Sequence, residues 1–202
     1  MGNLEAELTR RYRRIGDRVL TKSDRSAQVK VFTLVAASTL ALAALDCWGQ
    51  GAGPTDPQIA AIVVTANQVD IDAGKLAKSK AENKEVKAFA SQMVTDHTGV
   101  NKSATALVTR LKVTPEENPT SRSLKSGGET NIEHLKTLKG AAFDRAYIDN
   151  EVTYHQSVLD AIDHTLIPGA KNAELKALLV KVRPAFEAHL VHAKQIQSTL
   201  RS

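Results

Sequence analysis

Apolar residues recur at the spacing of an α-helix in four long segments, and this periodicity constrains the fold more than any other feature of the sequence. In each segment the apolar positions return every three or four residues and form one stripe, which an isolated helix cannot bury. The pattern therefore predicts an all-α domain in which four long helices pack their stripes together. The segments run from about Asp56 to Lys80, Asn83 to Lys112, Ala141 to Leu166 and Ala173 to Leu200.

The lengths of the connections predict how these helices are arranged. Short turns separate the first helix from the second and the third from the fourth, so each pair should be antiparallel. The segment Thr114–Gly128 contains two prolines and two glycines, which predicts a break, followed by a short helix over Glu129–Lys139. We therefore expect an antiparallel four-helix bundle with a long crossover between the second and third long helices. Asp56 is expected to cap the first helix, with Pro57 at its first position.

The positive charge of the chain is concentrated at its N-terminal end. Residues 1–43 carry eight Lys and Arg against four Asp and Glu, whereas residues 44–202 carry nineteen against eighteen. The segment expected to fold is nearly neutral and has no basic stripe with interleaved aromatic residues, so no nucleic-acid binding is expected. Cys47 is the only cysteine, which excludes an intramolecular disulfide and a cysteine-based metal site within one chain.

A basic segment followed by a short apolar run predicts an export signal. The run Val31–Leu45 is too short to span a membrane comfortably but suits the hydrophobic region of a signal peptide. We therefore assign residues 1–45 to a signal peptide with an extended basic region, residues 46–56 to a flexible spacer and residues 57–202 to the helical domain. This organisation predicts a protein of the periplasm or cell envelope.

Three alternatives for the N-terminal segment stay open. Translation could begin downstream, near Leu20. Cys47 follows Ala44-Leu45-Asp46, which loosely resembles a lipoprotein acylation site, although Asp46 stands where a small residue is needed. The apolar run could also remain as an uncleaved anchor.

Three of the four predicted helices carry one histidine near the middle of their inward stripe. These are His97, His155 and His189, and Asp70 lies near the middle of the first helix, at the edge of its stripe. Antiparallel helices of similar length bring their midpoints to one level, so these side chains are expected to converge. Glu151 precedes His155 by one helical turn and could accept a hydrogen bond from it.

Imidazole and carboxylate groups bind zinc, copper, iron and manganese, and helical bundles build metal sites from facing side chains. The candidate ligands of a divalent metal ion are therefore His97, His155, His189, Asp70 and Glu151. The alternative is a polar layer that sets helix register without binding an ion, because a buried histidine is often simply hydrogen-bonded to a carboxylate. Further polar candidates are Asp96, Asp72, Asp149 and His192.

Three stretches of the sequence resemble a known bacterial family. They are Ala73–Lys102, with FASQMVTDH, Gly140–Asp163, with FDRAYIDNEVTYH, and Asn172–Lys194, with PAFEAHLVHA. Together they resemble exported ferritin-like domains of unknown function, often labelled outer-membrane proteins, over about residues 57–200. The resemblance implies a ferritin-like four-helix fold and a location in the cell envelope. The motif residues it covers are Asp96, His97, Glu151, His155 and His189, and relatives tend to carry acidic residues at Asp70 and Asp72.

One departure from the wider ferritin-like superfamily bears on function. Di-iron carboxylate bundles use the pattern Glu-x-x-His on two helices, and this pattern occurs nowhere in the sequence. Glu151 is followed three residues later by Tyr154, and His189 is preceded three residues earlier by Phe186. The difference argues against a standard ferroxidase or oxygen-activating centre.

Three functional hypotheses follow. The first is a non-catalytic envelope bundle that binds a metal ion, or senses its environment, through the three histidines. The second is a structural or interaction bundle in which the histidine layer only specifies packing. The third is a metal-dependent oxidoreductase with a non-standard metal pair. The sequence identifies no protein partner; association with the cell envelope and assembly into a homo-oligomer are expectations.

Overall fold

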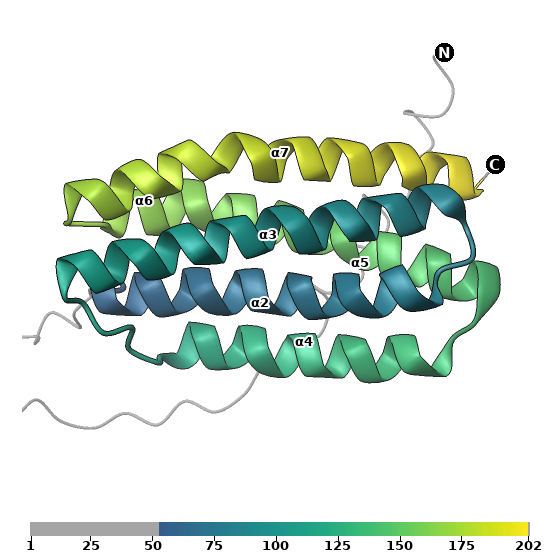
Figure 1. Ribbon diagram of the computed structural model, residues 1–202, viewed down its shortest axis with the longest axis horizontal. Coiled ribbons are helices and arrows are strands. Elements are labelled where there is room, and N and C mark those ends of the chain that lie inside the picture. The colour runs from purple at the N-terminus through teal and green to yellow at the C-terminus, as the bar shows by residue number, and fades with distance from the viewer. Residues whose placement is uncertain (1–52, 202) are drawn as a thin grey trace, which may run out of the picture. The chain divides into compact units, whose positions relative to one another are not determined.

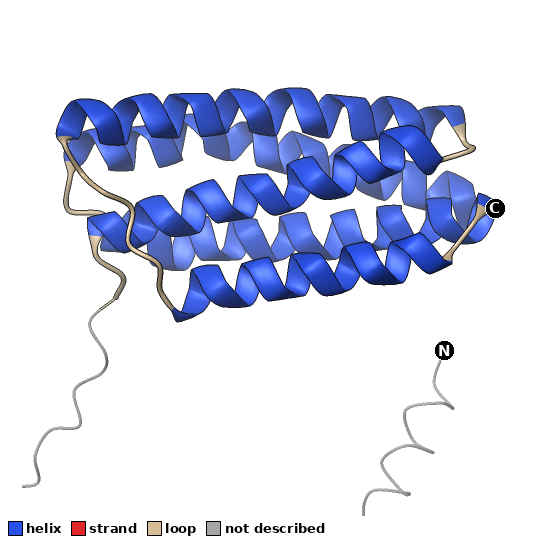
Figure 2. Cartoon of the chain, turned by 60° about the horizontal axis from the view of Figure 1, so that its bottom comes forward, coloured by secondary structure: helices blue, strands red, loops and turns tan. Residues whose placement is uncertain are grey.

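The computed structural model describes residues 53–201, which are all-helical and contain no strand (Figures 1 and 2). The predicted signal peptide, Cys47 and most of the predicted spacer lie outside the described residues. No helix within the described part combines the length and apolarity needed to cross a membrane. The elements are α2 (Asp56–Lys80), α3 (Lys84–Leu111), α4 (Pro119–Thr137), α5 (Gly140–Ala161), η1 (Ile162–Leu166), α6 (Ile167–Gly169) and α7 (Ala173–Arg201).

Four of the long helices pack as two antiparallel pairs. Helix α2 lies along α3, and α5 lies along α7, as the short connections predict (Figure 1). The pairs face each other, with α3 against α7 and α2 against α5. Helix α4 connects the pairs and contacts both α2 and α5. The second helix of one pair and the first helix of the other therefore run in the same direction, as a crossover requires.

The core consists of two apolar clusters with a polar layer between them. One cluster centres on Ile59, Leu107, Leu166 and Phe186, and the other on Phe89, Met93, Phe143, Tyr147 and Ile196. Along each of α2, α3 and α5, the buried polar residues of the middle fall between the residues of the two clusters. On α7, His189 lies near the boundary between the last residues of the first cluster and the first residues of the second. The residues of this polar layer are Asn67, Asp70, His97, Glu151, His155 and His189.

Two buried or partly buried aspartates tie the ends of the helix pairs together. The carboxylate of Asp144 on α5 accepts hydrogen bonds from the backbone amides of Glu82 and Asn83, just before α3. The carboxylate of Asp56 accepts hydrogen bonds from the amides of Lys171 and Asn172, just before α7. Because the two contacts lie at opposite ends of the bundle, they restrict sliding of the helices and hold the polar layer in register.

The start of α2 corrects the predicted cap. Thr55, rather than Asp56, is the N-cap, and its side chain accepts a hydrogen bond from the amide of Gln58. The Gln58 side chain accepts in turn from the amide of Thr55, which completes a capping box. Because Asp56 is not the cap, its carboxylate is free to accept the hydrogen bonds from the amides of Lys171 and Asn172 before α7.

The crossover contains a longer helix than the sequence predicts. Helix α4 begins at Pro119, ten residues before the predicted start at Glu129, and runs through Gly127 and Gly128. Asn118 caps it and Ser121 completes a capping box. The prediction of a break up to Gly128 was wrong because Gly128 serves close packing: a Cβ there would lie 2.7 Å from Cγ1 of Val69 on α2.

The third predicted helix also continues beyond its expected end. A single π-helical turn, η1, follows α5, and the helical backbone runs on through Pro168 to Gly169. Arg183 of α7 holds this turn through two hydrogen bonds from its guanidinium to the carboxylate of Asp163. Helix α7 itself is continuous across Pro184.

Candidate metal centre

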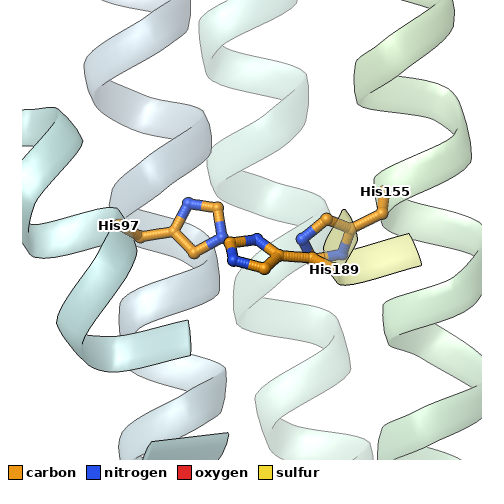
Figure 3. Close-up of side chains that lie close together, drawn as sticks. All are labelled: His97, His155 and His189. Atoms are coloured by element: carbon orange, nitrogen blue, oxygen red, sulfur yellow. The ribbon is translucent and has the colours of Figure 1, made fainter. Parts of the chain in front are cut away.

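The structure brings the five predicted ligand residues together in the middle of the core. His97 on α3, His155 on α5 and His189 on α7 point their rings toward one another (Figure 3). One ring nitrogen from each histidine lies within 4.8 Å of the others. Oxygen atoms of Asp70 on α2 and Glu151 on α5 form a second such group with His155. All five side chains are buried.

The hydrogen bond of His97 determines which of its nitrogen atoms faces the centre. Nδ1 of His97 lies 2.7 Å from Oδ1 of Asn67. The amide group of Asn67 donates to the carbonyl oxygen of Val63 at 2.7 Å, so Oδ1 is the acceptor that remains for His97. His97 therefore donates through Nδ1–H, and in the neutral ring the lone pair lies on Nε2.

His155 is oriented in the same way by its own helix. Its Nδ1 lies 3.0 Å from the backbone carbonyl oxygen of Glu151, which can only accept a hydrogen bond. Oε2 of Glu151 lies 3.4 Å from the same nitrogen. Nδ1 is thus the N–H donor, and the lone pair of the neutral ring lies on Nε2.

His189 presents its other nitrogen to the centre. Its Nε2 lies 2.9 Å from Oδ2 of Asp96, a carboxylate whose side chain is 40% exposed. Donation to this carboxylate leaves the lone pair of neutral His189 on Nδ1, which is buried and has no hydrogen-bond partner. Asp96 is therefore a solvent-accessible group in direct contact with buried His189.

Asp70 has a carboxylate oxygen close to the inward-facing nitrogen atoms of His97 and His155. Its Oδ2 lies 3.0 Å from Nε2 of His97 and 3.5 Å from Nε2 of His155. None of these three atoms has hydrogen-bond geometry with a partner. In neutral histidines both nitrogen atoms would present lone pairs to a carboxylate, an arrangement that is repulsive unless a proton or a metal ion lies between them.

The two buried carboxyl groups have opposite pKa shifts. Burial raises the pKa of Glu151 to about 7, and the negative charge of Asp70 adds to the effect. Burial also acts to raise the pKa of Asp70, but its close contact with His97 and the charges of His155 and His189 outweigh burial and lower this pKa. Without a bound cation, the site accommodates one carboxylate more readily than two.

The histidine pKa values also reflect this asymmetry. Burial acts to lower the pKa of His155, but its hydrogen bond to Glu151 and the charge of Asp70 outweigh burial and raise it. For His189, burial lowers the pKa and Asp96 only partly compensates. His155 thus lies next to both buried carboxyl groups, Asp70 and Glu151.

Comparison with known proteins identifies the family of this chain. A family described as "Domain of unknown function (DUF4142)" matches residues 48–196. The chain belongs to this family. No curated protein matches it, and no solved structure does. The matched segment includes all five residues of the candidate centre.

In this member of the DUF4142 family, three further polar candidates lie away from the centre. Asp72 is an exposed partner of Gln68 and Lys75. Asp149 accepts hydrogen bonds from Gln197 and Arg201 near the end of α7. His192 packs its ring against Phe89 in the second apolar cluster, with the ring centroids 5.3 Å apart.

Two residues of the site are not among the predicted ligands but shape the centre. Asn67 orients His97, and its position three residues before Asp70, on the same face of α2, is the signal that could have identified it. Phe186 covers the histidines from the side of the first apolar cluster, with its ring centroid 5.0 Å from that of His97 and 6.0 Å from that of His155. Its apolar stripe position gave no indication of this contact.

Proposed function

We propose that this protein binds a divalent metal ion within its buried histidine layer, with imidazole nitrogen atoms of His97, His155 and His189 and a carboxylate oxygen of Asp70 as ligands. The observation that carries the proposal is the orientation of the three rings. Each donates one N–H to an oxygen outside the centre, and each leaves its other nitrogen buried without a hydrogen bond. Such outer hydrogen bonds orient histidine ligands in metal sites.

The groups around these ligands suit the same role. Asn67, Glu151 and Asp96 would orient the three histidines from outside the coordination shell. The carboxylate of Glu151 approaches His155 from the Nδ1 side, so we assign Glu151 an orienting role rather than a ligand role. The same carboxylate would add negative charge next to the ion. A divalent cation would balance the charges of Asp70 and Glu151, whose joint ionisation is unfavourable in the buried site.

The ligand set indicates the class of ion but not one element. Three imidazoles and a carboxylate suit zinc, copper, iron and manganese. They disfavour calcium and magnesium, because these ions prefer ligands that are all oxygen atoms. The proposed role is non-catalytic metal binding or sensing, because the Glu-x-x-His pattern of di-iron oxidases is missing. A layer that only specifies packing is the competing interpretation.

Metal analysis of the purified full chain tests the proposal. After equilibration with Zn²⁺, Cu²⁺, Fe²⁺ or Mn²⁺ and removal of free ions, we expect one ion per chain and a higher thermal unfolding temperature for at least one metal. His97→Ala and His155→Ala should each abolish both effects. His134→Ala and His164→Ala, at exposed histidines of α4 and η1, are the matched controls. Neither stoichiometric metal nor a thermal shift with any of the four ions would defeat the proposal.

We also propose that the helices form a ferritin-like four-helix bundle with α4 as its crossover. The pairing of α2 with α3 and of α5 with α7, and the crossover between the pairs, support this proposal. An experimental structure that paired these helices differently would contradict it.

Export to the periplasm or cell envelope is proposed on the sequence of residues 1–45. The basic segment and the apolar run support it. Fractionation of cells that produce the full chain, together with the mass of the mature N-terminus, distinguishes cleavage from lipidation at Cys47 and from a retained anchor. Recovery of the uncleaved chain in the cytoplasm would contradict export.

A further inference from the structure

An apolar cavity lies beside the histidine layer, on the side of the first apolar cluster. Its volume is about 130 Å³. It is bounded by residues of α2, α3, α4, α5, η1 and α7, and aliphatic and aromatic side chains such as Ile62, Val158, Leu179 and Phe186 make up most of its lining. None of the proposed metal ligands lines it.

The polar side chains in the cavity lining are already engaged or lie at its rim. The amide of Asn67 bonds to Val63 and His97. The hydroxyl of Tyr154 donates to the carbonyl oxygen of Ala66 at 2.8 Å. Ser157 donates to Thr153 and, like Thr120, is exposed at the surface. The interior therefore offers little to hold water, which needs two to four polar partners in a buried site.

A surface groove adjoins this cavity. The groove has a volume of about 250 Å³ and is lined by residues of α2, α4 and α5, including Ser123, Asn131 and Asn150. Leu124 and Tyr154 line both the groove and the cavity.

We infer that this cavity is a binding site for a small, uncharged, apolar molecule about the size of a benzene ring. The volume is close to that of an engineered apolar protein cavity of about 150 Å³ that stays dry and binds benzene. The lining selects against charged and strongly hydrogen-bonding molecules, because they would lose their hydration and gain no partners. An occupant of the cavity would lie against Phe186, whose ring also contacts His97 and His155.

Benzene and glycerol are matched probes of this site, because they have equal numbers of non-hydrogen atoms and opposite polarity. We expect benzene to bind the metal-free full chain saturably in calorimetry and to raise its thermal unfolding temperature, and glycerol at the same concentration to show no saturable binding. Failure of benzene to bind wild-type protein would overturn the inference. Saturable binding of both probes would overturn the proposed selectivity.

Filling the cavity tests where benzene binds. Ala161→Leu and Ala66→Leu introduce a larger side chain from two different walls, and each should weaken benzene binding by about tenfold or more, a loss of about 1.4 kcal/mol. Ala142→Leu makes the same chemical change at an exposed position of α5 and should bind benzene as wild type does. Unchanged affinity in both filled variants, with helical content retained, would overturn the location. His155 does not line the cavity. If His155→Ala loses metal binding but still binds benzene, the metal site and the benzene site are independent, and the two proposals can be tested separately.

Discussion

At the residue scale, the outer hydrogen bond of each histidine determines which ring nitrogen faces the centre. His97 and His155 donate through Nδ1 to Asn67 and to the backbone of Glu151, whereas His189 donates through Nε2 to Asp96. The inward nitrogen is thus Nε2 in two rings and Nδ1 in the third. A metal ion bound there would depend on residues that do not touch it.

Replacement of Asn67 tests this dependence. Asn67→Ala removes the acceptor for Nδ1–H of His97, so the ring is free to change its tautomer and orientation. We expect the affinity for the bound metal to fall by about 10- to 100-fold, as measured by competition with a chelator. Asn101→Ala is a suitable control, because Asn101 is a nearby asparagine that donates to the backbone of Val64 rather than to a histidine. Equal loss in the two variants would argue against an orienting role for Asn67.

Glu151 gives a prediction for the metal-free protein. Its pKa in the folded state is about 7, above the ordinary value of 4.5, so folding favours its protonated form. The resulting stability is present at low pH and is lost as pH rises from about 4.5 through 7. Glu151→Gln keeps the shape and removes the charge. We expect the variant to be more stable than wild type at pH 8, by on the order of 2 kcal/mol in urea unfolding, with the difference closing near pH 4.

The exposed Glu117 provides the comparison for that experiment. Glu117→Gln should change the free energy of unfolding little, because the substitution lies at an exposed position. A pH-independent difference between Glu151→Gln and wild type would show that burial of the charge is not its cause.

At the element scale, the two adjacent glycines of α4 have different environments. A Cβ at Gly128 would lie 2.7 Å from Cγ1 of Val69, whereas one at Gly127 would meet nothing within 4 Å. Gly127→Ala should stabilise the protein by about 0.5–1 kcal/mol, because alanine favours the helix. Gly128→Ala should destabilise it, because the stiff, branched Val69 must move. Urea unfolding of the two variants measures both effects, and stabilisation by both would contradict the close packing of α4 on α2.

The same pair of glycines shows why the sequence predicts four helices well and the crossover poorly. The ranges of α2, α3 and α7 agree with prediction within a residue or two, because long apolar stripes and short turns define them locally. Helix α4 has only three buried residues, Ser121, Gly128 and Leu135, so it has almost no apolar stripe. From a single sequence, a glycine that lets two helices pack closely cannot be distinguished from a glycine that ends a helix.

At the scale of the whole molecule, helix register determines that the polar residues meet. Similar helix lengths and antiparallel pairs were enough to predict that Asp70, His97, His155 and His189 share one level. Ring orientation was not predictable, because it depends on contacts between helices, such as Asn67 with His97 and Asp96 with His189. The separation of Asp72 and Asp149 from the centre likewise depends on helix rotation, which a stripe defines only approximately.

Metal binding should make the stability of the whole bundle depend on pH in a specific way. An ion that binds only the folded chain stabilises it by about 2.7 kcal/mol at one hundred times its dissociation constant. Protons compete with the metal ion for the same nitrogen atoms, and the pKa of His155 is raised, so this ring becomes protonated at a higher pH than an ordinary imidazole. We therefore expect the metal-induced rise in unfolding temperature to be largest near pH 8 and to disappear as pH falls toward 5, in scanning calorimetry with and without the metal. In His155→Ala the rise should be missing throughout this range, and a rise that persists unchanged at pH 5 would show that the ion binds elsewhere.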